Sequence, residues 1–250
     1  LVNRGAGRRN VVAIPVIGQI AAGLPIPVPG DLEGSDATES VELGTDLVPN
    51  LRAGLFAPRW LVDLKAIGDL AGIYFDPERG LEIGALTTLS AVAESPLVGR
   101  HYPVLAQAAA TVASPVLRNM GTLGGNLCLE TRCLWYNQSF FWRQACGFCL
   151  KKDGEVCHVA PGGKRCWAVW SGDTAPALLA LEAEIEISSP RGRRWLPLAE
   201  FYKNDGQDRI RLEPDEILIR VRVAARRAGY RGHYQKLRIR GSIDYPLAGV

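Results

Sequence analysis

The stretch that decides the fold opens with RNMGTLGGN at residues 118–126 and closes with SGD at residues 171–173. All six cysteines of the chain lie between these two motifs, from Cys128 to Cys166. Such clustering needs a local cause, which is a metal, a set of disulfides or a redox-active thiol pair. The glycine loop alone is ambiguous, because it is typical both of a tight turn and of a loop whose backbone N–H groups cradle a phosphate.

The setting of the cysteines favours a metal. Buried cysteines usually act as small hydrophobic residues, but six of them in one polar, glycine-interrupted segment do not fit that role. Disulfides belong to oxidising compartments, and the apolar part of the N-terminal segment is broken by Pro15 and Pro25, so we find no secretory signal. The pair Cys146 and Cys149 has the spacing of zinc ligands, whereas an iron–sulfur cluster takes four thiolates at wider spacing.

Together these motifs resemble the FAD-binding (medium) subunit of the molybdenum hydroxylases, the xanthine dehydrogenase and carbon monoxide dehydrogenase family. Most members run directly from the GGN loop into an S-D-x-x-P-A-L helix, whereas here residues 127–170 intervene. This insertion resembles that of the 4-hydroxybenzoyl-CoA reductase β subunit, which holds a 4Fe-4S cluster on the pattern C-x15-C-x7-C-x8-C. The cysteines that match this pattern, and that the resemblance implies as cluster ligands, are Cys133, Cys149, Cys157 and Cys166.

The resemblance also implies an FAD site. Its first loop corresponds to Leu43, Gly44, Thr45, Asp46 and Leu47, which would wrap the pyrophosphate. The family usually has glycine where this chain has Leu43, and a side chain there obstructs a close approach. By its residues alone, the same loop is a capped helix start that can itself hold phosphate.

Further cofactor-binding residues follow from the same resemblance. Asp173 matches an aspartate that binds the ribityl chain of FAD, although it is equally placed to cap the following helix. The other implied contacts are Val112, Thr122, Leu123, Gly124, Gly125, Asn126, Leu218 and Lys236.

Residue patterns predict an α+β protein. A hairpin is expected over 72–84, strands over 60–64, 182–188, 216–223 and 234–240, and helices over 102–113 and 174–181. The resemblance implies the two-subdomain FAD-binding fold of the vanillyl-alcohol-oxidase type. We expect an atypical leader at 1–40, an FAD-binding domain at 41–223 with the insertion at 127–170, and the start of a truncated C-terminal domain at 224–250. Within the leader, residues 14–25 resemble the self-cleavage region of LexA-type repressors.

Composition sets the outer limits. Hydrophobic residues make up 47% of the 250 and charged residues 22%, as in globular proteins generally. A net charge of +3 is too small to indicate nucleic-acid binding, and no apolar run is long enough to span a bilayer. Cytoplasm is therefore the expected location.

The resulting hypothesis is an electron-transfer subunit with no catalytic residue of its own. Similar to 4-hydroxybenzoyl-CoA reductase, it would relay electrons from a carrier such as ferredoxin through a 4Fe-4S cluster and FAD to 2Fe-2S and molybdenum subunits. One alternative is an oxidative hydroxylase subunit of the xanthine or carbon monoxide dehydrogenase type. The other is a zinc-stabilised module that stacks single-stranded nucleic acid on Trp135, Tyr136, Phe141 and Trp142.

Overall fold

The computed structural model describes residues 47–56, 58, 64–65, 67–226, 229–241 and 243–250. Several expectations lie outside this described part. They are the leader with its LexA-like segment at 14–25, the loop residues Leu43 to Asp46, and most of the strand expected over 60–64.

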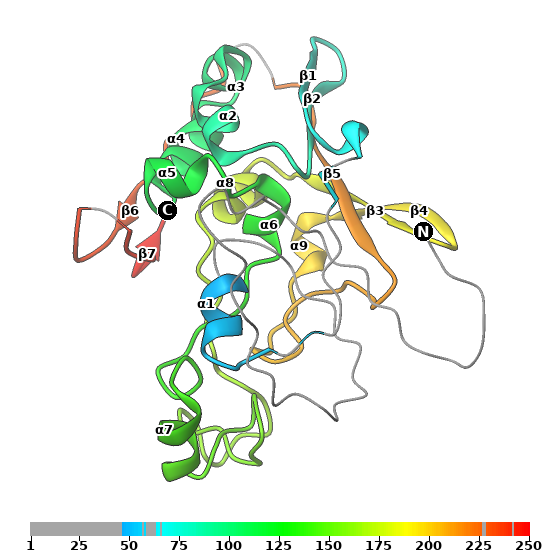
Figure 1. The fold of residues 1–250 in the computed structure, drawn as a ribbon. Helices are drawn as coiled ribbons and strands as arrows, with labels where there is room; N and C mark the ends of the chain where they lie inside the picture. Colours follow the sequence, from blue (N-terminus) through cyan, green and yellow to red (C-terminus); the bar gives the residue numbers. More distant parts are fainter. Residues whose placement is uncertain (1–46, 57, 59–63, 66, 227–228, 242) are drawn as a thin grey trace, which may run out of the picture.

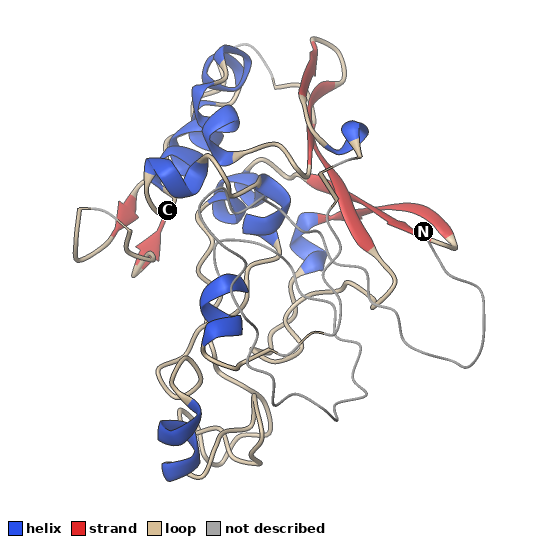
Figure 2. Cartoon of the chain, viewed as in Figure 1, coloured by secondary structure: helices blue, strands red, loops and turns tan. Residues whose placement is uncertain are grey.

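An antiparallel five-stranded sheet forms the centre of the molecule, with strand order β1-β2-β5-β3-β4 (Figures 1 and 2). The hairpin of β1 and β2 was predicted from its turn residues. The third strand overlaps the strand predicted over 182–188 and pairs with the fourth in a second hairpin. The strands are β1 (Ile73–Asp76), β2 (Gly80–Gly84), β3 (Glu184–Ser189), β4 (Gly192–Pro197) and β5 (Ile217–Val223).

The two faces of this sheet differ as period-two alternation requires. Ile83, Ile185 and Val221 point into the core and are at most 1% exposed. On the opposite face, arginines of β5 bind glutamates of its neighbours: Arg220 Nη1 lies 2.7 Å from Glu82 Oε2. The helices therefore pack on the apolar face of the sheet and not on this charged face.

Short capped helices cover the apolar face. Thr88 Oγ1 accepts a hydrogen bond from Ala91 N–H at the start of α2, and Ser95 caps α3 in the same way. The helices of this core are α2 (Leu89–Glu94), α3 (Pro96–His101), α4 (Pro103–Thr111), α5 (Pro115–Arg118), α6 (Leu123–Leu127), α8 (Thr174–Ala180) and α9 (Leu198–Phe201). The helices predicted over 102–113 and 174–181 are present as α4 and α8, whereas α3, α5 and α6 were not predicted.

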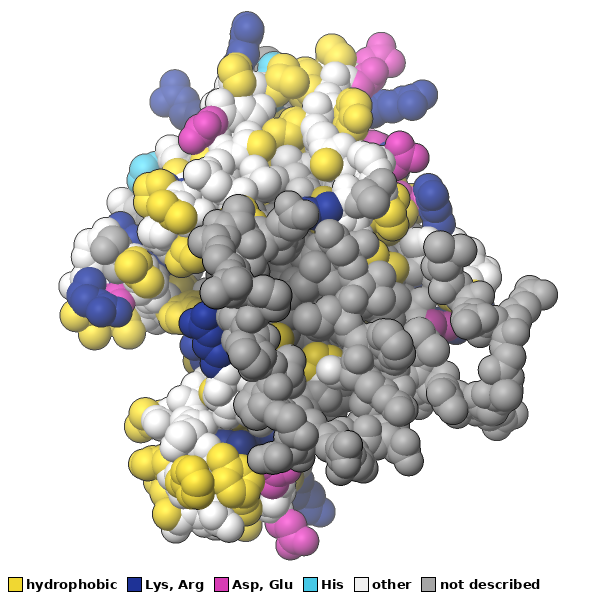
Figure 3. All heavy atoms as spheres, viewed as in Figure 1, with side chains coloured by type: hydrophobic (Ala, Val, Ile, Leu, Met, Phe, Trp, Pro, Cys, Tyr) yellow, Lys and Arg dark blue, Asp and Glu magenta, His cyan; other side chains and the backbone are white. Residues whose placement is uncertain are grey.

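Residues 128–170 form a lobe that extends away from the sheet below α1 (Leu47–Arg52) and carries α7 (Phe140–Ala145) (Figure 1). A small apolar cluster joins it to the residues that follow α1, because Leu55 is buried together with Tyr136 and Cys149 of the lobe. Hydrophobic side chains are exposed at its far end (Figure 3), and Phe141 is 80% exposed.

The C-terminal part forms a two-stranded sheet of β6 (Lys236–Leu237) and β7 (Ala248–Gly249) beside α4 and α5 (Figure 1). The strand predicted over 234–240 is therefore shorter than alternation indicated, because only two residues find a strand partner. A short 3-10 helix, η1 (Gly68–Leu70), completes the described elements. Among the described residues, no helix is both long and apolar enough to cross a membrane.

Candidate functional site

The GGN loop is folded as the first turn of α6 rather than as a simple turn. Thr122 is its N-cap, and the Thr122 Oγ1 accepts a hydrogen bond from Gly125 N–H at 3.2 Å. Leu123 N–H donates to Thr87 O at 2.9 Å, and Asn126 N–H donates to Thr122 O at 3.0 Å. These N–H groups therefore donate to protein oxygens in this structure, where the sequence had left both a tight turn and a phosphate cradle open.

Gly124 lets α6 lie directly against the residues that follow β2. Its N–H donates to Ala85 O at 2.8 Å. A Cβ at this position would lie 2.8 Å from Ala85 Cβ, closer than real side chains approach. Ala85 N–H in turn donates to Ile219 O at 3.0 Å, next to Leu218 in β5. The loop is thus fixed to the centre of the sheet, where Leu218 is a buried core residue.

Asp173 lies at the meeting point of three distant segments. Its carboxylate accepts hydrogen bonds from the Tyr234 hydroxyl at 2.9 Å and from Lys236 Nζ at 2.9 Å. Lys236 Nζ also donates to Thr111 O at 3.1 Å, and Thr111 precedes Val112 at the end of α4. The structure therefore brings together Asp173 and Lys236, which the resemblance had implied separately, next to the residue that precedes Val112.

Of the two roles that the sequence left open for Asp173, helix capping is not seen in the structure. Asp173 precedes α8 but makes no side-chain cap, because its carboxylate is used by Tyr234 and Lys236. Asn126 takes over this role from across the site: its Oδ1 accepts from Thr174 N–H at 3.1 Å and from the Thr174 hydroxyl at 2.6 Å. One hydrogen-bonded unit thus joins the GGN loop to the SGD motif.

Burial dominates the electrostatics of this unit. It raises the pKa of the Asp173 carboxyl, and the hydrogen bond and charge of Lys236 offset this only in part. Burial also raises the pKa of Tyr234, and the negative charge of Asp173 adds to that shift. Tyr234 is therefore a hydrogen-bond donor at neutral pH.

Two polar atoms beside this unit lack a partner among the described residues. They are the buried Ser171 Oγ and Trp170 Nε1. The Trp170 indole folds over Gly172 so closely that a Cβ on Gly172 would lie 2.3 Å from the ring. Buried polar groups normally find a hydrogen-bond partner, so the unmet donors fit a polar ligand such as the ribityl or phosphate part of FAD.

Sequence reasoning missed Tyr234, Ser171 and Trp170. A signal for Tyr234 was present, because residues two apart in a strand face the same side and Tyr234 precedes Lys236 by two positions. No signal predicted the unmet donors of the other two residues. Leu47 begins α1, and its partners in the first flavin loop lie outside the described residues.

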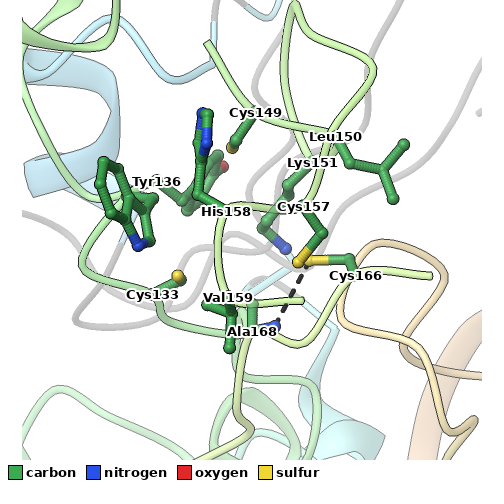
Figure 4. Close-up of a pocket in the computed structure, with 11 residues that line it drawn as sticks. Cys133, Tyr136, Cys149, Leu150, Lys151, Cys157, His158, Val159, Cys166 and Ala168 are labelled. Carbon is green, nitrogen blue, oxygen red and sulfur yellow. Dashed lines mark hydrogen bonds between the residues drawn. The ribbon is translucent and has the colours of Figure 1, made fainter. Parts of the chain in front are cut away.

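The lobe holds a second candidate site (Figure 4). All four cysteines of the predicted cluster pattern line one cavity, although they are spread over 34 positions of sequence, from Cys133 to Cys166. Cys149, Cys157 and Cys166 are buried, Cys133 is half-buried, and all are free thiols.

Backbone N–H groups point at two of the sulfurs. Ala168 N–H donates to Cys166 Sγ at 3.4 Å. Burial acts to raise the pKa of the Cys157 thiol, but hydrogen bonds from backbone N–H groups, including that of Trp167, outweigh it and hold that pKa below its usual range. Burial raises the pKa of the Cys166 thiol. Such N–H donors stabilise thiolates, which are the form that binds metals.

The spacing of these side chains bears on what they can hold. Within the described residues, no group of three or more His, Cys, Asp or Glu side chains is arranged around a single metal ion. An iron–sulfur cluster is a larger body than one ion, so its four thiolates stand farther apart. Cysteine thiolates are the donor type that both zinc and iron–sulfur clusters take. Cys128 packs in the main core and Cys146 follows α7, and neither lines the cavity.

His158 lines the same cavity without a defined ligand role. Its Nε2 contacts the carbonyl oxygen of Phe148, and its ring lies 4.7 Å from that of Trp135. These contacts show that it packs beside the cysteines.

Comparison with known proteins assigns the chain. Residues 32–225 match the family described as the FAD binding domain in molybdopterin dehydrogenase. The chain belongs to this family. This confirms the resemblance to the medium subunits of molybdenum hydroxylases and the assignment to an FAD-binding fold.

Similar proteins include parts of larger oxidoreductases. The aldehyde oxidoreductase FAD-binding subunit PaoB of Escherichia coli K12 is 32% identical over 216 residues, which are 83% of this chain and 67% of that protein. The xanthine dehydrogenase FAD-binding subunit of Escherichia coli O157:H7 is 30% identical over 176 residues, or 70% and 47% of the two chains. This chain therefore spans about half the length of the latter relative.

Solved structures give the same fold. Carbon monoxide dehydrogenase from Hydrogenophaga pseudoflava superposes with a TM-score of 0.61 at 27% identity, covering 82% of this chain and 56% of its counterpart. The mixed α/β fold of this chain is therefore similar to that of a chain of this carbon monoxide dehydrogenase. The LexA-like segment and the reductase-type insertion receive no support from these comparisons.

Proposed function

We propose that this chain is the FAD-holding part of the electron-transfer subunit of a molybdenum-dependent oxidoreductase. The observation that carries the proposal is the unit in which Asn126, Asp173 and Lys236 meet, in a chain of the FAD-binding family. Its partners would be a large subunit with the molybdenum cofactor and a small subunit with 2Fe-2S clusters.

Each part of the site has a role in this proposal. Bound FAD would supply the electron transfer. Leu43 to Leu47 and Thr122 to Asn126 would form its two loops, and Ser171 Oγ would donate a hydrogen bond to it. Val112 and Leu218 would form an apolar wall of the FAD site. Lys236 holds the Asp173 carboxylate in place beside the loop.

The direction of electron flow follows the relatives. They are named as a xanthine dehydrogenase subunit and an aldehyde oxidoreductase subunit, which favours the oxidative alternative over the 4-hydroxybenzoyl-CoA reductase reading placed first by the sequence. Electrons would leave the substrate on the large subunit and pass outward. The FAD-binding domain would be residues 41–223, followed by the start of a C-terminal domain at 224–250.

A second candidate function rests on the four-cysteine cavity. In it, residues 127–170 are an insertion that holds a 4Fe-4S cluster on Cys133, Cys149, Cys157 and Cys166, exchanging electrons with a carrier such as ferredoxin. The shared cavity and the N–H groups directed at sulfur support it. The six free thiols are consistent with the reducing cytoplasm that we propose as the location.

The nucleic-acid alternative is weaker. Tyr136 is 2% exposed and Trp135 lines the cysteine cavity. Base stacking needs an open aromatic face, so these two rings are poorly placed for it.

Anaerobic purification of the full chain, with analysis of flavin, iron and acid-labile sulfide, tests both proposals. We expect FAD in the wild type and less FAD in D173A. Equal FAD content in D173A and wild type would contradict the flavin site.

For the cluster, we expect about four irons and four sulfides per chain, lost in C149S and C157S. The matched control is C146S, because Cys146 lies in the same lobe without lining the cavity. Zinc in place of iron, or iron that survives in C157S, would contradict the cluster.

A further inference from the structure

Lys151 is a buried cation in the wall of the four-cysteine cavity (Figure 4). Its side chain is only 6% exposed. The ammonium donates to Glu130 Oε1 at 2.6 Å, to Thr131 Oγ1 at 2.6 Å and to Gly206 O at 2.5 Å. An ammonium has three donors, so all of them are satisfied and the charge is fixed in place.

Other basic residues of the lobe are arranged differently. Lys152 is 32% exposed and lies near Asp153. Arg143 is buried, but it faces Asp153 and the rings of Phe140 and Phe148 and does not line the cavity. Of the residues lining the cavity, Lys151 is the one lysine or arginine.

The ion-pair partners of Lys151 do not cancel its charge. Glu130 is its only carboxylate partner among the described residues, and Glu130 Oε2 also lies 3.4 Å from Arg209 Nη1. One carboxylate is thus shared between two cations, and the group of three carries a net positive charge. Charges that are buried in this way are screened much less than those at the surface.

We propose that Lys151 is a fixed counter-charge that raises the reduction potential of the lobe's cluster, and that Glu130 limits this effect; the inference rests on the cluster proposed above. Reduction adds one negative charge to a centre that four thiolates already make anionic. A fixed cation nearby favours the reduced state more than the oxidised one, and net charge is a main determinant of cluster potential. Lys151 is then a positioning charge and not a ligand.

Four variants test this: K151M, K151R, E130Q and R209M. Each is made in the full chain and purified anaerobically with any subunits that co-purify. K151M should lower the cluster potential, by about 59 mV if the reduction equilibrium falls tenfold. E130Q should move the potential in the opposite direction, because it removes the negative neighbour and keeps the cation. K151R retains the charge and should shift the potential less than K151M.

A redox titration followed by electron paramagnetic resonance reads the potential directly and does not depend on turnover. If K151M fails to take up iron, E130Q and R209M provide the test. E130Q should raise the cluster potential because it removes a negative charge, and R209M should lower it because it removes a positive one. Loaded variants with unchanged potentials would overturn the role of Lys151 and leave the cluster standing. A wild-type chain without iron and sulfide would overturn the cluster itself, and this inference with it.

Discussion

The ion pair of Asp173 and Lys236 is almost completely enclosed, with side chains 4% and 3% exposed and 2.9 Å between Oδ2 and Nζ. Removing one partner of such a pair leaves the other charged and buried, which typically costs about 3–5 kcal/mol. We therefore expect K236M to lower the free energy of unfolding by about this amount. Urea unfolding of the cofactor-free chain measures it.

The exposed pair of Lys203 and Asp208 provides the control. Its atoms are 2.6 Å apart, but its side chains are 30% and 69% exposed. Surface pairs contribute about 0–1 kcal/mol, so D208N should leave the unfolding midpoint nearly unchanged. A similar loss in K236M and D208N would show that burial does not set the cost.

Glu216 gives the fold a dependence on pH. The Arg194 guanidinium beside it holds the pKa of its carboxyl below the usual range. A carboxyl whose pKa is depressed by folding stabilises the fold above its unfolded pKa, about 4.3. That contribution is lost as the pH falls through the folded value.

We expect the wild type to lose more stability than E216Q between neutral pH and about pH 3. The matched control is E213Q, three residues away and exposed. Urea midpoints at the two pH values measure the difference. An equally steep acid loss in wild type and E216Q would contradict the assignment.

At the scale of elements, two helical glycines differ in what surrounds them. A Cβ on Gly124 of α6 would lie 2.8 Å from Ala85 Cβ, whereas a Cβ on Gly99 of α3 would meet nothing within 4 Å. Alanine is favoured over glycine within helices by up to about 1 kcal/mol. We therefore expect G99A to be neutral or slightly stabilising.

G124A should be destabilising, because the backbone of α6 or of Ala85 must move. It should also reduce FAD content, since this helix carries the second flavin loop of the proposed site. Thermal unfolding and flavin analysis of both variants measure these effects. Equal stability and flavin content in G124A and G99A would show that close approach of α6 is unimportant.

Elements with local causes were predictable from sequence. The hairpin of β1 and β2 follows from its Asp-Pro-Glu-Arg-Gly turn, and α2 follows from its Thr88 cap. In contrast, α3 has only six residues and no clear apolar period. The length of β6 was not predictable, because its partner Ala248–Gly249 comes from eleven or more residues further along the chain.

At the scale of the whole molecule, the candidate sites show the same division. Motif resemblance gave Asp173, Lys236 and the four cysteines, but it could not give the partners of Asp173. The Tyr234 hydroxyl reaches Asp173 across 61 positions of sequence, and such pairing is set by tertiary packing. Because its carboxylate binds Tyr234 and Lys236, Asp173 does not form the helix cap that the local pattern equally allowed.

The lobe and the sheet domain should respond differently to loss of metal. The buried residues of the small apolar cluster, Leu55, Tyr136 and Cys149, are few, whereas the sheet domain has an extensive core of its own. Polar contacts hold the lobe to that domain: Gly206 N–H donates to Cys166 O at 2.9 Å and its carbonyl accepts from Lys151. The Arg209 guanidinium donates to Cys128 O at 2.9 Å and to Leu129 O at 3.1 Å. A segment with so few apolar contacts depends on its ligand, because the free energy of ligation becomes free energy of folding.

Removing iron from the purified chain should therefore increase amide hydrogen exchange throughout residues 128–170 while β2, β3 and β5 remain protected. Mass spectrometry of peptides from both regions, before and after anaerobic treatment with a chelator and an oxidant, makes the comparison. The variant C157S should behave as the iron-depleted wild type does, and C146S as the loaded one. Unchanged protection in the lobe after iron is lost would mean that its side-chain packing suffices, and that the four cysteines meet in one cavity without a metal to hold them there.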